Sequence, residues 1–294
     1  MSILFKGDCL NCLQFLYEKG FQEKIDLCYI DVPFFSNRCY SASGKDGNVA
    51  SFNDCWAGGI NHYIDWLYKR VEQIHRVLKP TGSFYLHCDW HANAYIRVMI
   101  LDKIFGDKNL IREIVWNRGN ASGGKAAANN WIHSHDTLFF YSKTQNRNFN
   151  KLYELYSQTY IKERFKYNDN DGKGPYRLQG SGDNLRKQYL SDSKGKAITS
   201  VWNIADINVM AKERIGYPTQ KPEALLERII KASSNEGDIV LDAFCGGGTT
   251  GAVAEKLGRR WIMCDINDTA IEKTKQRLAG AQYEYIEKIG ENYE

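Results

Sequence analysis

The chain has 294 residues, enough for one large domain or two small ones, and its formal net charge of +4 is too small to indicate a partner. A composition of 43% hydrophobic and 25% charged residues is typical of globular proteins and argues against a disordered or fibrous chain. No apolar run approaches the roughly 20 residues of a membrane helix, and the N-terminus lacks a secretory signal, so we expect a cytoplasmic protein without a membrane partner.

In the first half of the chain, short apolar runs alternate with amphipathic ones, which predicts an α/β sheet. We expect strands at 3–8, 24–31, 83–89, 110–117 and 135–143, and helices at 9–20, 60–78 and 93–106. The helix at 60–78 is the clearest, because its apolar side chains recur every three or four residues and share one face. A long, small and polar loop joins the last two strands, and such loops are usually functional or mobile.

The segment from 144 to 200 has a different character. From Lys143 to Lys196 the chain contains 12 Lys/Arg and 6 Asp/Glu, a balance of 12 − 6 = +6, which leaves the rest near −2. Six tyrosines recur between Tyr153 and Tyr189. Basic residues interleaved with aromatic ones suit a nucleic-acid surface, although a solvated insertion without a partner would have the same composition.

From Pro222 onwards the alternation of helix and strand resumes. We expect helices at 222–237 and 249–258, and strands at 238–244 and 259–265.

Three glycines at 246–248 connect a predicted strand to a helix, where they would let a ligand approach the backbone. Asp265 ends the next strand, 265 − 246 = 19 residues later, the spacing at which an acid binds ribose hydroxyls in Rossmann-type folds. The fingerprints for dinucleotides and for nucleotide triphosphates are both absent. We therefore predict an adenosine-type ligand without phosphates, such as S-adenosyl-L-methionine; a tight turn with a capping acid is the alternative.

Two clusters contain the residue types of metal sites. Cys9 and Cys12 form a CxxC pair, but no second pair has zinc spacing. The stretch HCDWH at 87–91 fits the polar end of a strand that leads into a helix. The sequence therefore predicts no metal ion. The eight cysteines are scattered, and four of them lie in or beside predicted strands, which is typical of reduced, buried thiols.

Three motifs in fixed order resemble those of the DNA amino-methyltransferases, in the permuted group whose catalytic motif precedes the cofactor loop. The family's Asp-Pro-Pro-Tyr/Phe motif stands here as Asp31-Val32-Pro33-Phe34. Its His/Tyr-Pro-Thr-Gln-Lys-Pro stretch stands at 217–222, and its Asp-Pro-Phe-x-Gly-x-Gly-Thr-Thr loop at 242–250. The chain departs from the family at Val32 and Ala243, which replace prolines.

The resemblance implies a Rossmann-like methyltransferase fold with a mostly parallel, doubly wound sheet. Residues 1–143 would form the catalytic part, 144–205 an inserted target recognition region, and 206–294 the cofactor-binding part. The implied partner is double-stranded DNA, and the resemblance leaves open a homodimer and an accompanying restriction endonuclease.

By the same resemblance, the enzyme transfers a methyl group from S-adenosyl-L-methionine to the exocyclic amine of a base flipped out of the duplex. Asp31 and the carbonyl of Val32 would accept the two amine protons, while Phe34, placed by Pro33, would stack on the base. An acid at position 31 favours N6 of adenine. The alternatives are N4 of cytosine, an RNA or protein-glutamine substrate, and a catalytically impaired DNA-binding relative.

The implied cofactor site combines the catalytic acid with the glycine loop and its flanking segments. Its expected members are Asp8, Asp31, Thr219, Lys221, Asp242, Phe244, Cys245, Gly246, Gly247, Gly248, Thr249, Thr250 and Asp265. Asp8 would also fit a helix cap, and Lys221 the solvated start of a helix. In the insertion we expect Lys162, Arg164 and Lys166 to contact DNA.

Overall fold

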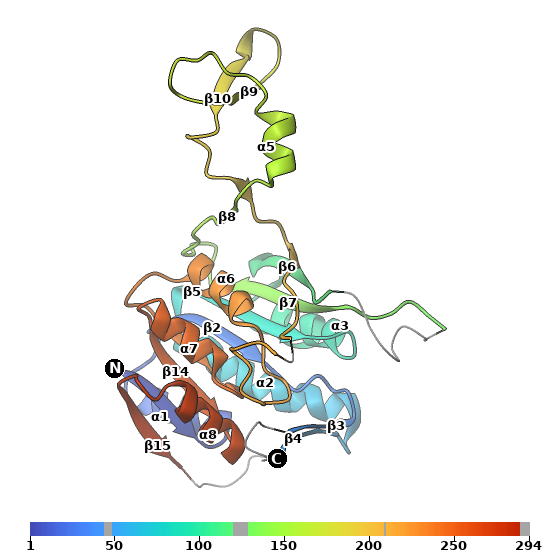
Figure 1. Ribbon diagram of the computed structural model, residues 1–294. Coiled ribbons are helices and arrows are strands. Elements are labelled where there is room, and N and C mark those ends of the chain that lie inside the picture. Colours follow the sequence, from blue (N-terminus) through green and yellow to red (C-terminus); the bar gives the residue numbers. More distant parts are fainter. Residues whose placement is uncertain (44–48, 120–128, 209, 289–294) are drawn as a thin grey trace. The chain divides into compact units, whose positions relative to one another are not determined.

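A computed structural model describes residues 1–43, 49–119, 129–208 and 210–288 (Figure 1). Part of the polar loop that precedes residue 135 therefore lies outside the described residues. The chain divides into two compact units. The α/β unit comprises Met1–Asn150 and Ser200–Glu294, and the insertion unit comprises Lys151–Thr199. Within the described ranges, no helix is long and apolar enough to cross a membrane.

A nine-stranded sheet forms the centre of the α/β unit (Figure 1), in the order β12-β6-β7-β5-β2-β13-β14-β1-β15. The strands are β1 (Ser2–Lys6), β2 (Ile25–Asp31), β5 (Leu78–Cys88), β6 (Leu110–Asn117), β7 (His135–Ser142), β12 (Val201–Asn203), β13 (Ile239–Asp242), β14 (Arg260–Asp265) and β15 (Tyr283–Glu287). Only β7 runs antiparallel to its neighbours in this sheet. The mostly parallel, Rossmann-like fold predicted from the sequence is confirmed.

Helices cover both faces of this sheet because successive strand residues point to opposite sides. On one face, α1 (Cys9–Glu18) and α2 (Gly59–Val77) bury apolar side chains such as Leu16 and Leu67 against the sheet. On the other face lies α6 (Glu223–Ser233), where Ser233 Oγ meets the hydroxyl of Tyr85 from β5 at 2.8 Å. Each fully buried Leu contributes about 1.5–3 kcal/mol to folding, so these faces hold the strand ends in fixed positions.

The helix predicted at 93–106 is interrupted. The structure has α3 (Asn93–Ile96), a π-helical turn over Arg97–Leu101, and α4 (Asp102–Ile104). The wide turn lets the adjacent residues Ile100 and Leu101 both enter the core, where each is fully buried.

Several short elements were not predicted. They are the hairpin β3 (Arg38–Ser43) and β4 (Val49–Asp54), the helix α8 (Asp268–Arg277) and the edge strand β15. In α8 the buried positions include Ala270, Lys273 and Thr274, so small and polar residues hide its helical period.

The insertion unit contains α5 (Gln158–Arg164), the antiparallel pair β9 (Tyr176–Gln179) and β10 (Arg186–Tyr189), and the pair β8 (Tyr153–Glu154) and β11 (Lys196–Ala197). Its centre is aromatic rather than aliphatic. The Arg177 guanidinium lies 5.8, 6.0 and 5.2 Å from the rings of Tyr156, Tyr160 and Phe165, and it donates a hydrogen bond to Tyr160 Oη at 2.6 Å. Cation–π contacts thus contribute to the stability of this unit, alongside its few buried apolar side chains.

The predicted insertion, 144–205, is longer at both ends than this compact unit. Asn150 N donates to the carbonyl of Ala232 in α6 at 2.7 Å, and β12 joins the central sheet through β6. These hydrogen bonds place the two flanks in the α/β unit.

Candidate active site

Segments that are distant in sequence meet at the carboxyl edge of the sheet. Strand β2 lies between β5 and β13, so Asp31 at the end of β2 lies next to the loop that follows β13. Asp265 ends β14, the next strand along. Ligands of open α/β sheets bind at this edge, and the topology therefore brings the predicted catalytic motif and the cofactor loop together.

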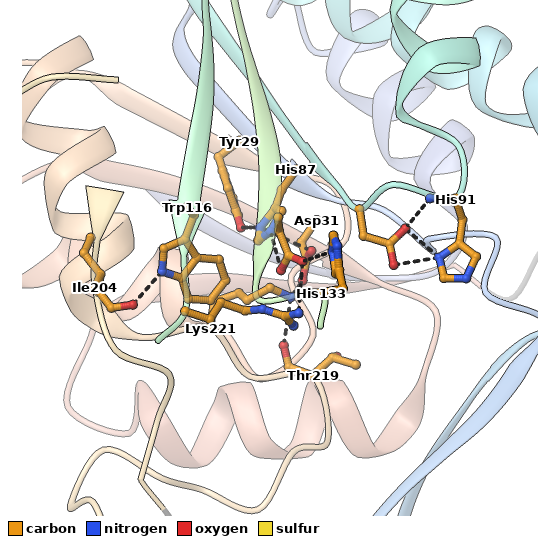
Figure 2. A network of polar contacts seen from close by, with 12 residues as sticks. Tyr29, Asp31, His87, His91, Trp116, His133, Ile204, Thr219 and Lys221 are labelled. Carbon is orange, nitrogen blue, oxygen red and sulfur yellow. Dashed lines mark hydrogen bonds and ion pairs between the residues drawn. The ribbon is translucent and has the colours of Figure 1, made fainter. Parts of the chain in front are cut away.

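Asp31 and Lys221 form an ion pair at this edge (Figure 2). Lys221 Nζ donates to Asp31 Oδ2 and also to the carbonyl of Thr219, at 3.2 Å. The other carboxylate oxygen, Oδ1, is buried and accepts no hydrogen bond from any residue that the structure describes. A buried acceptor without a donor is costly, so Oδ1 is the natural partner for an N–H group of a bound molecule.

A buried polar network lies behind Asp31 (Figure 2). His87 is fully buried and pairs in register with Asp31 across β5 and β2. Its Nδ1 is 2.9 Å from the Tyr29 hydroxyl and 3.6 Å from Asp31 Oδ1, and its Nε2 is 3.3 Å from Asp136 Oδ2. The Arg118 guanidinium lies 3.6 Å from Asp136 Oδ1. Burial alone would raise the pKa of Asp136, but the hydrogen bond with His87 and the charge of Arg118 lower it below its usual range.

Aromatic rings enclose this network. The rings of Phe34 and Trp116 lie 5.6 and 5.4 Å from the His87 ring. Trp116 Nε1 donates to the carbonyl of Ile204 at 2.7 Å (Figure 2). Lys221 Nζ lies 5.4 Å from the Phe34 ring centre. Val32 is buried, 3% exposed, between the acid and the ring. The arrangement joins a flat apolar surface to a hydrogen-bond acceptor, as recognition of a planar base would require.

Asp54 organises the backbone after the catalytic motif. It is 1% exposed and accepts from Phe35 N at 3.1 Å, Ser36 N at 2.7 Å and Ser36 Oγ at 2.6 Å. Phe35 has φ 60°, a strained conformation for a side chain of this size, and these bonds hold it there. The sequence offered no signal for this residue, because an acid at the end of a short hairpin strand has no distinctive pattern.

The glycine loop packs closely against other parts of the chain. A Cβ on Gly246 would lie 2.9 Å from the ring of Tyr217, and one on Gly247 would lie 2.9 Å from Ile215. Gly248, with φ +71°, would bring a Cβ to 2.6 Å from Thr274 Oγ1. The glycines are therefore required by neighbouring protein atoms, whereas the sequence suggested ligand approach as the reason. Two of the three motifs meet here, since Tyr217 begins the stretch at 217–222.

Several expected cofactor residues hold this loop from inside. Asp242 is 2% exposed and accepts from Thr250 Oγ1 at 2.5 Å and from Phe244 N at 3.1 Å. Burial raises the pKa of Asp242 to about 7, although these two hydrogen bonds oppose the shift. Thr249 accepts from Arg277 at 2.8 Å, and the buried Cys245 faces Thr274. We therefore expect Asp242, Thr249, Thr250 and Cys245 to position the loop through protein contacts.

Asp265 and Asp8 differ in their contacts within the protein, and therefore in their remaining capacity to accept hydrogen bonds from a ligand. Asp265 accepts from Gly246 N at 2.8 Å and from Asn267 N at 2.9 Å, and burial raises its pKa against these bonds. An ionised carboxylate has about four acceptor sites, so Asp265 can also accept from a hydroxyl. Asp8 caps α1 by accepting from Leu10 N at 2.8 Å, and its other oxygen pairs with the buried Arg70 at 2.6 Å. The helix-cap alternative for Asp8 is thus observed.

Known proteins similar to this chain are methyltransferases. A family model described as DNA methylase matches residues 25–276. DNA adenine methyltransferase YhdJ of Escherichia coli strain K12 is 32% identical over 269 residues, which cover 91% of this chain and 80% of the relative. Type II methyltransferase M.HpaI of Haemophilus parainfluenzae is 30% identical over 271 residues, 92% and 73% of the two chains.

Solved structures share the fold. PvuII DNA methyltransferase, described as cytosine-N4-specific, gives a TM-score of 0.62 at 18% identity and covers 94% of this chain and 86% of its own. The M1.HpyAVI–SAM complex gives 0.58 at 16% identity, with 95% and 99% coverage. At these identities the likeness concerns the fold.

Proposed function

This chain belongs to the DNA methylase family, and we propose that it transfers a methyl group to N6 of adenine in double-stranded DNA. S-adenosyl-L-methionine is the cofactor of the family. The choice of base goes beyond family membership, because the similar proteins include an adenine methyltransferase and a cytosine-N4-specific one. Their names also include type II methyltransferases, which supports a role in a restriction-modification system.

The observation that carries the proposal is the unpartnered oxygen of Asp31. Oδ1 is buried, lacks a donor among the described residues, and belongs to the motif that ends in the Phe34 ring. An exocyclic amine is a planar nitrogen with two N–H donors and a conjugated, weakly nucleophilic lone pair. An acceptor beside an aromatic surface would bind one N–H while the ring holds the base.

The residues of the chain would activate the amine by orientation. Asp31 Oδ1 accepts one N–H of the amine and the Val32 carbonyl accepts the other, which pyramidalises the nitrogen and directs its lone pair away from the ring. Lys221 holds Asp31 through Oδ2 and so fixes the direction of Oδ1. When bound, S-adenosyl-L-methionine supplies a methyl group on a sulfonium. As the nitrogen gains that group it loses a proton, which Asp31 is positioned to accept.

An acid at position 31 supports adenine over cytosine. Members of the family that act on cytosine N4 more often have serine there, and the relative YhdJ is named an adenine methyltransferase. A carboxylate is a stronger acceptor than a hydroxyl, so it polarises the N–H bond more strongly.

The carboxyl edge also fits an adenosine-type cofactor. Asp265 has acceptor capacity left for ribose hydroxyls, and the partly exposed ring of Phe244 offers a flat surface near the loop. Lys221 and Thr219 are the residues that the resemblance assigns to the methionine part, and Lys221 is already paired with Asp31. We propose that these residues bind the cofactor, with Asp265 contributing the most affinity.

The insertion unit provides a candidate DNA surface. A hollow of about 470 Å³ is lined by residues that include Tyr160, Arg164, Lys166, Tyr167 and Leu178. Tyr167 is 39% exposed, so an aromatic group that can stack on a base lines the same hollow as the basic side chains. We propose that Arg164 and Lys166, which line the hollow, and the exposed Lys162 in the same unit bind DNA phosphates.

The proposal is tested by incubating the purified protein with S-adenosyl-L-methionine labelled in its methyl group and with duplex DNA, structured RNA or protein. Label should enter duplex DNA, and nucleoside digestion should recover it as N6-methyladenine. The Asp31→Ala variant serves as the control for contaminating activity. Label in N4-methylcytosine would refute the choice of base, and label in RNA or protein alone would refute the DNA substrate.

A further inference from the structure

The network behind Asp31 constrains which nitrogen of His87 bears the proton. His87 has an acceptor at one nitrogen and a donor at the other: Asp136 Oδ2 lies 3.3 Å from Nε2, and the Tyr29 hydroxyl lies 2.9 Å from Nδ1. Asp31 Oδ1 lies 3.6 Å from the same Nδ1 (Figure 2). The protonation of Nδ1 therefore decides whether Asp31 has a hydrogen-bond donor beside it.

We propose that Asp136 and Tyr29 hold His87 in the neutral tautomer with the proton on Nε2. Nδ1 then offers no N–H to Asp31, and Oδ1 stays available to accept a hydrogen bond from the target amine. This inference rests on the proposed function, because the His87 tautomer affects methyl transfer only if Asp31 binds an N–H of the substrate. His87 is then a positioning residue, since it touches the catalytic acid rather than the base.

Both neighbours of His87 favour this tautomer. Asp136 is 2% exposed, and the Arg118 guanidinium 3.6 Å from its Oδ1 favours the ionised carboxylate, which can only accept; the donor it faces is therefore Nε2–H. Burial raises the pKa of the Tyr29 phenol, and the nearby carboxylate of Asp31 raises it further, so Tyr29 keeps its proton and can donate it to Nδ1. With both hydrogen bonds made, no proton remains on Nδ1.

The opposite tautomer would fit the hydrogen-bonding groups of both neighbours less well. A proton on Nδ1 would displace the Tyr29 hydroxyl proton and point towards Asp31, while Asp136 Oδ2 would face a lone pair. The rings of Trp116 and Phe34 flank the imidazole, and His87 has no exposed surface through which water could compensate. The observation that Asp31 Oδ1 has no donor among the described residues agrees with an Nδ1 that carries no proton.

The tautomer can be measured directly by nuclear magnetic resonance. Protein labelled with ¹⁵N in histidine gives two-bond ¹H–¹⁵N correlations that distinguish Nδ1–H, Nε2–H and doubly protonated rings. The chain has six histidines, and His87→Gln identifies the His87 signals by their loss. We expect Nε2–H at pH 7.5 in the free protein. A proton on Nδ1, in either the neutral or the charged ring, would overturn the proposal.

The functional consequence is tested with Asp136→Asn. The neutral amide can face Nε2 with either its oxygen or its NH₂, so the bias is lost and part of the His87 population should carry its proton on Nδ1. We expect kcat for methyl transfer to fall about 10–100-fold while the KM for S-adenosyl-L-methionine stays within about twofold. Asp102→Asn is the matched control, because Asp102 binds Tyr141 outside this network and its substitution should leave kcat unchanged.

The outcomes separate the two proposals. A changed tautomer in Asp136→Asn with unchanged kcat would overturn the inference, as would a fallen kcat with an unchanged tautomer. A wild-type protein that shows the Nε2–H tautomer but methylates no nucleic acid would instead refute the proposed function, since the spectra of the free protein need no turnover.

Discussion

The carboxyl edge of the α/β unit and the insertion unit use charged residues in opposite ways. At the edge, charges are paired and partly or fully buried: Asp31 binds Lys221, and Asp136 faces Arg118 and His87. In the insertion unit Arg177 lies among aromatic rings, whereas Lys162, Arg164 and Lys166 are exposed and form no ion pair among the described residues. Paired, buried charges have fixed directions and suit chemistry, whereas exposed ones have long reach and suit attraction to a polyanion. Substitutions at the edge should therefore change rates and stability, and those in the insertion unit should change affinity and its salt dependence.

Removing the catalytic carboxylate should have the largest effect. Asp31→Ala deletes the acceptor for the amine, and we expect kcat to fall about 10²–10⁴-fold, or about 3–5 kcal/mol in the barrier. Cofactor affinity measured by calorimetry should stay within about tenfold. Turnover within about tenfold of wild type would show that Asp31 has no catalytic role. It would also refute the expectation that substitutions at the carboxyl edge change rates.

The buried acid of the cofactor loop should make stability depend on pH. The pKa of Asp242 is raised to about 7 in the folded protein, so the folded state keeps a proton that the unfolded state releases near pH 4. Stability should therefore fall as pH rises from about 4 to about 7, by about 4 kcal/mol if the full shift is realised, and then level off.

Asp242→Asn should abolish that part of the pH dependence, because an amide can bond both Thr250 and the Phe244 N–H without burying a charge. Urea unfolding of both proteins at pH 5, 6, 7 and 8 gives the difference directly. Parallel curves for the two proteins would show that Asp242 ionises normally.

Substitution of Asp265 tests whether the cofactor binds at the same edge of the sheet. Asp265→Ala should weaken S-adenosyl-L-methionine binding by roughly 1.5–3 kcal/mol, the range for hydrogen bonds to a charged group. The loss includes a contribution from the Gly246 N–H, which would lose its acceptor. Asp265→Asn is the control, because it keeps an acceptor for Gly246. An unchanged dissociation constant in both variants would place the ribose elsewhere.

The α/β unit was predicted more completely than the insertion unit, for a physical reason. Its strands and helices bury one face each, so their periods are visible in the sequence, as in α2. The insertion unit is built around Arg177 and aromatic rings, and neither helical nor strand periodicity marks such a centre. Composition therefore suggested its partner, while α5 and the two antiparallel strand pairs went unpredicted.

Within the site, the motifs located Asp31 and Lys221 but not their surroundings. The structure shows these two residues in contact, 190 positions apart in the chain. His87 stood in a stretch interpreted as a polar strand end, and Asp136 had no motif at all. Their importance depends on which strands are neighbours: β5 pairs with β2 on one side and with β7 on the other. That pairing could not be obtained from one sequence.

Salt dependence tests the insertion unit. Replacing Lys162, Arg164 and Lys166 together by glutamine should reduce the slope of log affinity against log salt by about 2.7, if each neutralises one phosphate. Methyl transfer at saturating DNA should be unchanged. Lys19, Lys24 and Lys69, exposed on the α/β unit, make a matched triple for comparison. Equal slopes for wild type and the insertion triple would place the DNA surface elsewhere.

The departure at Val32 should have the smallest effect. Pro33 already biases Val32 towards extended conformations, so Val32→Pro adds little restriction, of order 0.4–1 kcal/mol. We expect single-turnover rates of the two forms to agree within about tenfold. An inert natural form and an active Val32→Pro variant would mark the chain as a disabled relative that only binds DNA.

The central claim, methyl transfer to adenine N6 in DNA, is tested most directly by methylation-sensitive long-read sequencing. The DNA should come from cells that express the wild-type chain or Asp31→Ala in a host without other DNA methylation. We predict N6-methyladenine at one recurring sequence motif in the wild-type sample and none in the variant. Modified cytosines at a recurring motif, or no modified base in either sample, would contradict the account.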